Sequence, residues 1–238
     1  MVSVREIEQA SMTKEKRKAA KNNLFAFYVG RPISYWLTIP FLQAGVSPNT
    51  VSLLSLVPVV AGIVISVFAR NLSSMYVCWG CFFIWNLLDG VDGNIARYTK
   101  KTSPLGAIYD AMGGYAATAA TFLAWGIAAE RFPGLLDSKF ISDYNLFLII
   151  GSLSSLSTLF PRLIMQKVRA EIGKDKAEVY KGSSLLRNIV FNLTSVSGFI
   201  QVIMLLTIPF RLFDLFTIAY FVINIGLMVL TIYQSLKK

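Results

Sequence analysis

Residues 89–114 read DGVDGNIARYTKKTSPLGAIYDAMGG. The stretch contains three aspartates, Asp89, Asp92 and Asp110, in a chain of 238 residues that is 55% hydrophobic and only 15% charged. A soluble domain has about a quarter of its residues charged. Acids are therefore scarce in this chain, and a cluster of them needs a physical reason.

Residues 99–103, TKKTS, divide the stretch into two predicted helices joined by a short hairpin, and Pro104 suits the first turn of the second helix. Residues three or four apart share a helix face. The first two aspartates therefore lie on one face of the first helix, and the third lies on one face of the second. Because antiparallel helices joined by a short hairpin face each other, we expect the three carboxylates to converge.

Apolar windows surround this hairpin on both sides along the chain. A helix needs about 20 apolar residues to cross about 30 Å of hydrocarbon. Six windows of roughly this length would leave a soluble protein too few polar residues for its surface. We therefore expect an all-α integral membrane protein with six transmembrane helices. The windows without a charged residue are 51–69, 71–88, 111–129, 144–161, 188–210 and 215–236.

The connections between these windows alternate between basic ones and ones with little net charge. The first 31 residues, the hairpin and the connection at 162–187 are rich in Lys and Arg, and the chain ends in two lysines. Cytoplasmic loops carry the excess of Lys and Arg, so both termini and the three-aspartate site are predicted to be cytoplasmic. The net charge of +10 then faces anionic headgroups, and no nucleic-acid partner is expected.

The N-terminal part differs from the rest of the chain. Residues 32–45 are apolar but too short to span, which favours an interfacial amphipathic helix. Pro48 then starts a long apolar run. We expect residues 1–47 to form a cytoplasmic segment with this interfacial helix, and residues 48–238 to form the six-helix membrane domain.

Ionised acids inside a membrane helix are costly unless a counter-charge neutralises them. Pairing with Arg97, Lys100 or Lys101 could neutralise one acid, but three converging acids favour a shared multivalent cation. The chain contains no histidine, and oxygen ligands prefer Mg²⁺, Mn²⁺ or Ca²⁺. The two cysteines, Cys78 and Cys81, lie in an apolar window and are predicted to be packing residues.

The stretch resembles the signature of the CDP-alcohol phosphotransferase family, D-x2-D-G-x2-A-R-x8-G-x3-D-x3-D. The first seven fixed positions match with the same gaps, and SPNTVS at 47–52 is similar to the family's turn into its first helix. The matching residues are Asp89, Asp92, Gly93, Ala96, Arg97, Gly106 and Asp110.

The resemblance implies a six-helix membrane enzyme that transfers a substituted phosphate from a CDP-linked donor, such as CDP-diacylglycerol, to an alcohol and releases CMP. It further implies that the three aspartates hold Mg²⁺ or Mn²⁺ in a two-metal site, and that the enzyme is a homodimer. The residues that it places at the CDP moiety are Asn49, Ser52, Gly93, Ala96, Arg97, Ser103 and Gly106.

The fourth aspartate of the signature is replaced by Gly114. In the family this acid is a metal ligand and the presumed base, so its loss weakens the second metal. Four interpretations stay open: a base from elsewhere, for which Tyr109 and Tyr115 are poor candidates; an acceptor that is already anionic; a relative that binds CDP-lipid without turnover; and a glycine introduced in place of the natural acid.

Two arginines near predicted helix ends are candidates for binding an acceptor phosphate, because arginine suits phosphate recognition. These are Arg162 and Arg187. A polyol phosphate acceptor would use them, whereas snorkelling to headgroups is the structural alternative. A metal-ion transporter is a third possible class of function. All three acids lie at one predicted cytoplasmic end of the helices, however, which argues against a conduction path.

Overall fold

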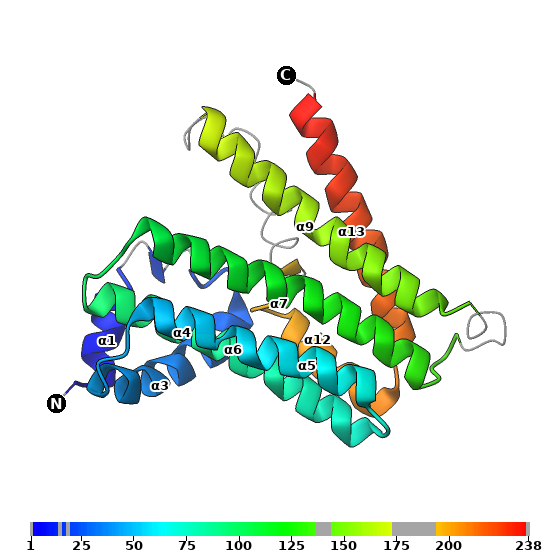
Figure 1. Cartoon of the computed structure of the whole chain (residues 1–238), viewed down its shortest axis with the longest axis horizontal. Helices are drawn as coiled ribbons and strands as arrows, with labels where there is room; N and C mark the ends of the chain where they lie inside the picture. The colour runs from blue at the N-terminus through cyan, green and yellow to red at the C-terminus, as the bar shows by residue number, and fades with distance from the viewer. Residues whose placement is uncertain (1, 14–15, 18–19, 137–143, 173–193, 237–238) are drawn as a thin grey trace.

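The computed structural model of the protein describes residues 2–13, 16–17, 20–136, 144–172 and 194–236 (Figure 1). These residues form helices and connections, and no strand occurs among them. The helices are α1 (Val4–Ser11), a π-helical turn η1 (Ala26–Gly30), α3 (Arg31–Gln43), α4 (Pro48–Leu54), α5 (Leu56–Phe68), α6 (Leu72–Tyr98), α7 (Pro104–Arg131), α9 (Leu146–Ile172), α12 (Ile200–Phe210) and α13 (Phe213–Leu236).

Helices α4, α5, α6 and α7 run side by side, and α9 and α13 cross α7 and extend away from this layer (Figure 1). Helix α3 lies against α6. The predicted interfacial helix at 32–45 thus corresponds to a helix that begins and ends within two residues of the expected bounds. Its position at a membrane interface stays a prediction.

The hairpin between α6 and α7 is built by local capping. Lys100 adopts the left-handed conformation (φ 55°), and the N–H of Lys101 donates to the carbonyl of Ala96 at 3.0 Å, which closes the C-terminus of α6. Ser103 accepts a hydrogen bond from the N–H of Gly106 at 3.0 Å and caps the N-terminus of α7. The predicted start of the second helix at Pro104 is confirmed.

Aromatic rings from α6, α7 and α13 form the main core. Trp125 on α7 is fully buried, contacts the rings of Phe82, Phe213 and Phe216, and donates from its indole nitrogen to Thr207 at 2.8 Å. This core fixes α7 against α6 and α13, and therefore sets where the carboxylate of α7 can lie.

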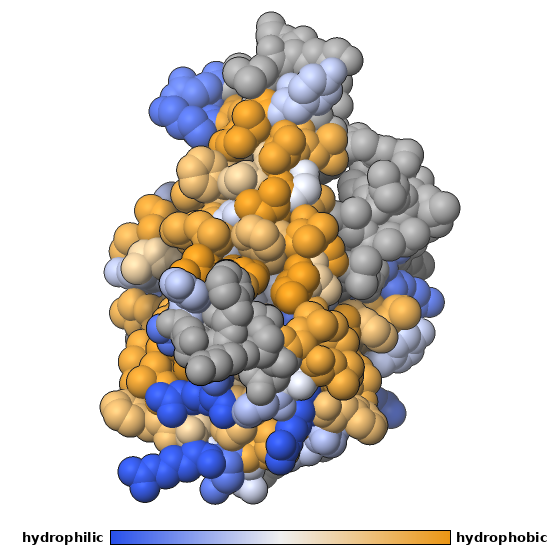
Figure 2. Space-filling model, turned by 90° about the vertical axis from the view of Figure 1, so that its right-hand side faces the viewer, coloured by the Kyte–Doolittle hydropathy of each residue, from blue (hydrophilic) through white to orange (hydrophobic). Residues whose placement is uncertain are grey.

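Three helical segments among the described residues are long and apolar enough to cross a membrane: Pro48–Phe68, Leu146–Val168 and Phe213–Tyr233. The first is broken after Leu54, so α4 and α5 together fill the window expected as one helix. Large apolar side chains stay exposed on these helices, and Figure 2 shows one face covered mostly by apolar side chains with hydrophilic ones mainly at its margins.

The other three expected spans are not among these candidate segments. Helices α6 and α7 contain the windows 71–88 and 111–129. Only the end of the window 188–210 forms a described helix, α12, which has 11 residues, and residues 188–193 lie outside the described part. The structure thus supports a membrane protein with three candidate spans, and the count of six stays a prediction.

Two glycines determine the contact between α7 and α9. A Cβ atom added at Gly126 would lie 2.9 Å from the Cα of Gly151 and 2.8 Å from the carbonyl oxygen of Phe147. Small residues allow membrane helices to approach this closely.

We expect Gly126→Ala to lower the free energy of unfolding by about 1–3 kcal/mol, because overpacking forces a backbone shift. Thermal unfolding in detergent measures this effect. Gly80→Ala on α6 is the matched control, because an added Cβ there meets no atom within 4 Å. A Gly126→Ala protein as stable as Gly80→Ala would contradict the close packing.

Candidate functional site

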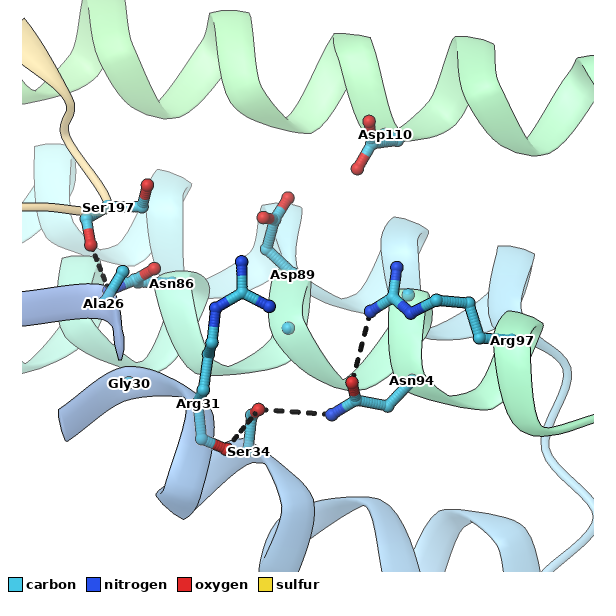
Figure 3. A pocket seen from close by; sticks show the side chains of 12 residues that line it. Ala26, Gly30, Arg31, Ser34, Asn86, Asp89, Asn94, Arg97, Asp110 and Ser197 are labelled. Atoms are coloured by element: carbon cyan, nitrogen blue, oxygen red, sulfur yellow. Dashed lines mark hydrogen bonds between the residues drawn. The ribbon is translucent and has the colours of Figure 1, made fainter. Parts of the chain in front are cut away.

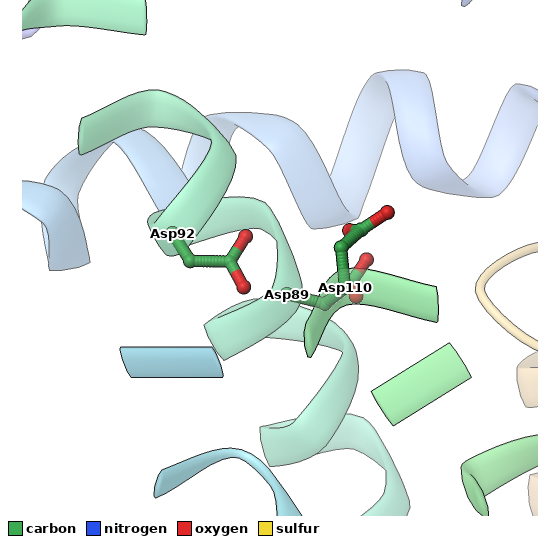
Figure 4. Close-up of side chains that lie close together, drawn as sticks. All are labelled: Asp89, Asp92 and Asp110. Atoms are coloured by element: carbon green, nitrogen blue, oxygen red, sulfur yellow. The ribbon is translucent and has the colours of Figure 1, made fainter. Parts of the chain in front are cut away.

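The three aspartates of the opening stretch come together between α6 and α7 (Figure 4). One carboxylate oxygen of each of Asp89, Asp92 and Asp110 lies within 4.8 Å of the others. Asp92 is buried at 6% exposure, Asp89 is half-buried and Asp110 is exposed. The helix spacing and the short hairpin bring these acids to one place, as the sequence predicts.

Asp92 is held by α4. The hydroxyl of Ser52 donates a hydrogen bond to its Oδ2 atom, and both side chains are buried. The carbonyl of Ser52 accepts from the hydroxyl of Ser55 at 2.7 Å, at the break between α4 and α5. The break therefore lies beside the residue that orients the buried carboxylate.

The donor set fits a hard divalent cation. Every ligand atom in the cluster is a carboxylate oxygen, the donor that Mg²⁺ and Mn²⁺ prefer. Within the described part of the chain, none of the three aspartates forms a salt bridge with a lysine or arginine. The three close carboxylates could therefore hold a divalent cation.

A first cavity, which we call the hairpin cavity, has a volume of about 250 Å³ and lies between α4, α6 and the start of α7. Asp92 and Asp110 form part of its wall. All seven residues expected to contact a CDP moiety line this one cavity: Asn49, Ser52, Gly93, Ala96, Arg97, Ser103 and Gly106.

At two points the wall of the hairpin cavity is formed by glycine and has no side chain. A Cβ atom at Gly93 would lie 2.8 Å from the Nη2 atom of Arg97, so the guanidinium of Arg97 lies over the backbone of Gly93. A Cβ atom at Gly106 would lie 3.0 Å from the Oδ1 atom of Asn49. The absence of side chains at these points brings polar groups of α4 and α6 to the cavity surface.

A second cavity, which we call the arginine cavity, has a volume of about 230 Å³ and lies between α3, η1 and α6. Arg31 and Arg97 enter it from α3 and α6, and Asp89 and Asp110 border it (Figure 3). The sequence analysis did not select Arg31, Ser34, Asn86, Asn94 or Ser197, which also line this cavity.

A third cavity, which we call the Gly114 cavity, lies between α6, α7, α9 and residues 194–197 and has a volume of about 370 Å³. Arg162 lines it together with Asp89, Asp110 and Gly114. The other candidate for an acceptor phosphate, Arg187, lies outside the described residues.

Gly114 itself has open space around it. A Cβ atom added there would meet no atom within 4 Å. The position follows Asp110 by one helical turn and faces the same cavity. The Cβ atom of an aspartate would therefore fit at this position without displacing its neighbours.

A family model for CDP-alcohol phosphatidyltransferase matches residues 45–232, which is most of the chain. The chain belongs to the CDP-alcohol phosphatidyltransferase family. A comparison with curated proteins finds no match. Membership in this CDP-alcohol phosphatidyltransferase family implies phosphotransferase chemistry in membranes, with CDP-linked donors, alcohol acceptors and a divalent metal. The aspartate cluster could hold such a metal.

The residues that the sequence analysis missed have weak local signals. Arg31 and Ser34 lie before the part of the chain that matches the CDP-alcohol phosphatidyltransferase family. Asn94 lies at a variable position between the fixed positions of the signature. A single arginine directly before Pro32, at the start of an apolar helix, was the available signal for Arg31.

We expect Ser52→Ala to weaken Mn²⁺ binding by about 10–100-fold, the usual effect of removing a hydrogen-bond partner of a ligating group. Electron paramagnetic resonance titration of the purified protein measures free Mn²⁺ directly. Ser66→Ala is the matched control, since the Ser66 hydroxyl bonds only its own helix, at the carbonyl of Ile63. Equal affinities in the two variants would contradict the role of Ser52.

Proposed function

We propose that the protein is a membrane phosphotransferase of phospholipid synthesis. It moves a substituted phosphate from a CDP-linked lipid such as CDP-diacylglycerol to an alcohol acceptor and releases CMP, with Mg²⁺ or Mn²⁺. One observation carries this proposal: three carboxylates lie within 4.8 Å of one another, and two of them, Asp92 and Asp110, line the cavity that contains all seven expected CDP-contacting residues.

In this proposal the hairpin cavity binds the nucleotide part of the donor. Asn49, Ala96 and Ser103 line it, and Arg97 would provide positive charge for the diphosphate. Asp89, Asp92 and Asp110 would hold the divalent metal, which would stabilise the charge that develops on the departing CMP. Ser52 orients Asp92 for that purpose.

The reaction forms a bond from the acceptor oxygen to the second phosphorus of the donor and breaks the bond from that phosphorus to CMP. A hydroxyl acceptor must also lose its proton. Gly114 has no group to accept it, and general base catalysis contributes about 10²–10⁴-fold. Turnover on a neutral alcohol is therefore expected to be slow. An acceptor that attacks through an anionic phosphate oxygen would lose no proton, but it would form a phosphoric anhydride instead of a phosphodiester.

The acceptor is proposed to occupy the Gly114 cavity. Arg162 lines this cavity together with Asp89 and Asp110, and arginine suits phosphate recognition. A small polyol phosphate is therefore the proposed acceptor class, and Arg187 is proposed to act with Arg162.

The second candidate function is binding of CDP-lipid without turnover. The observation that favours it is Gly114, because the position of the family's base has no functional side chain. Such a protein would keep the aspartate cluster and the hairpin cavity and would lack only the catalytic step. The two functions differ in turnover and not in binding.

We also propose the membrane arrangement expected from the charges: six spans, with both termini and the aspartate cluster cytoplasmic, in a homodimer. The three apolar segments and the exposed apolar surface support a membrane location. The lysines and arginines flanking the hairpin support a cytoplasmic hairpin.

CMP release from CDP-diacylglycerol by the purified protein tests the proposed enzyme. With Mg²⁺ or Mn²⁺ and a panel of alcohols and polyol phosphates, we expect release that depends on both metal and acceptor. Asp110→Asn should abolish it, because this change removes one of the three carboxylates. Binding of CDP-diacylglycerol without CMP release from any acceptor would favour the second candidate function.

Gly114→Asp tests the missing base. We expect this variant to raise CMP release with a neutral alcohol acceptor by about 10²–10⁴-fold, the usual contribution of a general base. Gly114→Asn is the matched control, because it has the same size without a basic carboxylate. Equal rates for the two variants would show that the lost acid does not limit turnover.

Labelling of single cysteines tests the topology. In a protein with Cys78→Ser and Cys81→Ser, we expect Arg70→Cys to react with a membrane-impermeant maleimide in intact cells. Lys101→Cys should react only after permeabilisation. Both positions are exposed. The reverse pattern would overturn the proposed orientation.

A further inference from the structure

Arg31 brings a second guanidinium to the aspartate cluster from outside the family-matched region. It is the first residue of α3 and lies 14 positions before residue 45, where the match begins. Its side chain is half-buried and enters the arginine cavity, which Arg97 lines from α6 (Figure 3).

Both guanidinium groups contain a buried nitrogen atom without a hydrogen-bond partner. The Nε atom of Arg31 and the Nε atom of Arg97 are both buried and have no hydrogen-bond partner. Within the described residues, neither arginine forms a salt bridge with a carboxylate. Two positive groups that share a cavity repel each other, and an anion bound between them would relieve this repulsion. Because Asp89 and Asp110 border the same cavity, such an anion would bind together with the divalent metal that these aspartates could hold. Guanidinium groups bind phosphate with paired hydrogen bonds.

Snorkelling does not account for this arrangement. A snorkelling arginine lays its stem along apolar surface and places its charged head in water. Here the Nε atoms lie in the interior, and the cavity is bordered by Asp89, Asp110 and polar groups from α3 and α6.

A buried hydrogen-bond network links α3 to Arg97. The Nη2 atom of Arg97 donates to the Oδ1 atom of Asn94 at 3.2 Å. The amide nitrogen of Asn94 donates to the hydroxyl of Ser34 at 3.2 Å and to that of Thr38 at 3.1 Å. Asn94, Ser34 and Thr38 are buried. They are positioning residues, so α3 both supplies Arg31 and holds Arg97 in place.

The close packing of α3 on α6 makes this possible. A Cβ atom at Gly90 would lie 2.9 Å from the Cβ of Ser34. The glycine thus lets α3 approach α6 one turn before Asn94, and the arginine cavity forms beside this contact.

The hairpin cavity and the arginine cavity adjoin each other, and this indicates which phosphate of a donor would reach Arg31. Gly93, Arg97 and Asp110 line both the hairpin cavity and the arginine cavity. A CDP-linked donor whose base lies in the hairpin cavity can place its first phosphate beside these shared residues. The second phosphate, joined to the first through one bridging oxygen, would then extend toward Arg31 and Asp89.

We propose that Arg31, with Arg97, binds the second phosphate of the CDP-linked donor, the phosphate that is transferred. This inference rests on the proposed function, because it assumes a CDP-linked ligand in the hairpin cavity. It adds an N-terminal residue to the site and assigns the arginine cavity to the donor.

Binding of CDP and CMP by the purified full-length protein with Mg²⁺ tests this inference by isothermal titration calorimetry. We expect Arg31→Ala to weaken CDP binding by about tenfold or more, since hydrogen bonds to charged groups contribute this much. CMP lacks the second phosphate, so its affinity should stay within about twofold of wild type. Arg31→Lys keeps the charge without the paired donors and should lose less CDP affinity than Arg31→Ala.

Arg70→Ala is the matched control, because Arg70 is exposed and lines none of the three cavities at the site. It should bind both nucleotides like wild type. Thermal unfolding in detergent verifies that each variant is folded, and Arg31→Lys carries the test if Arg31→Ala does not fold.

Three results would overturn the inference while leaving the proposed function in place. In the first, the Arg31 variants lose no CDP affinity. In the second, they lose CMP and CDP affinity equally, as a purely structural residue would. In the third, they lose binding of sn-glycerol 3-phosphate but keep that of CDP, which would assign Arg31 to the acceptor. A wild-type protein that binds neither CDP nor CMP would overturn the proposed function and this inference together.

Discussion

The repulsion among three carboxylates is the constraint on which the rest of this site depends. Two unit charges about 4 Å apart repel by about 4 kcal/mol at an effective dielectric constant of 20. Asp89, Asp92 and Asp110 meet within 4.8 Å in a chain with few charges. A fold that holds them there needs positive charge nearby, which a divalent cation would supply together with the guanidinium group of Arg97.

The surroundings of the acids match this requirement. Helix α4 donates a hydrogen bond to Asp92 through Ser52, and α6 places Arg97 between the hairpin cavity and the arginine cavity. Helix α3 adds Arg31 and anchors Asn94. The N-terminal segment is thus part of the site's architecture, although the family match begins only after it.

The residues expected to bind the donor are present, whereas the family's catalytic base is replaced by Gly114. The aspartate cluster and the seven residues of the hairpin cavity are all present, whereas the position of the family's base is a glycine with open space around it. The proposed donor site is therefore physically complete without Gly114. In the proposed function, what the glycine changes is how an acceptor in the Gly114 cavity would lose its proton, which makes the charge of the acceptor central to the proposed chemistry.

The sequence by itself determined the helical class, the hairpin at 99–103 and the meeting of the three acids. These features follow from apolar length, local capping and the 3.6-residue period, all of which act between near neighbours in the chain. It also indicated, through the family signature, seven residues that prove to line one cavity.

Only the tertiary structure decided the division of the first apolar window after Leu54, the space around Gly114 and the role of α3. The hydrogen bonds from Asn94 to Ser34 and Thr38 join residues 60 and 56 positions apart. Such contacts depend on how side chains of different helices pack, and no local period or spacing in the sequence encodes that packing. For the same physical reason, the proximity of Arg31 to Arg97 depends on the packing of α3 on α6 and has no local signal in the sequence.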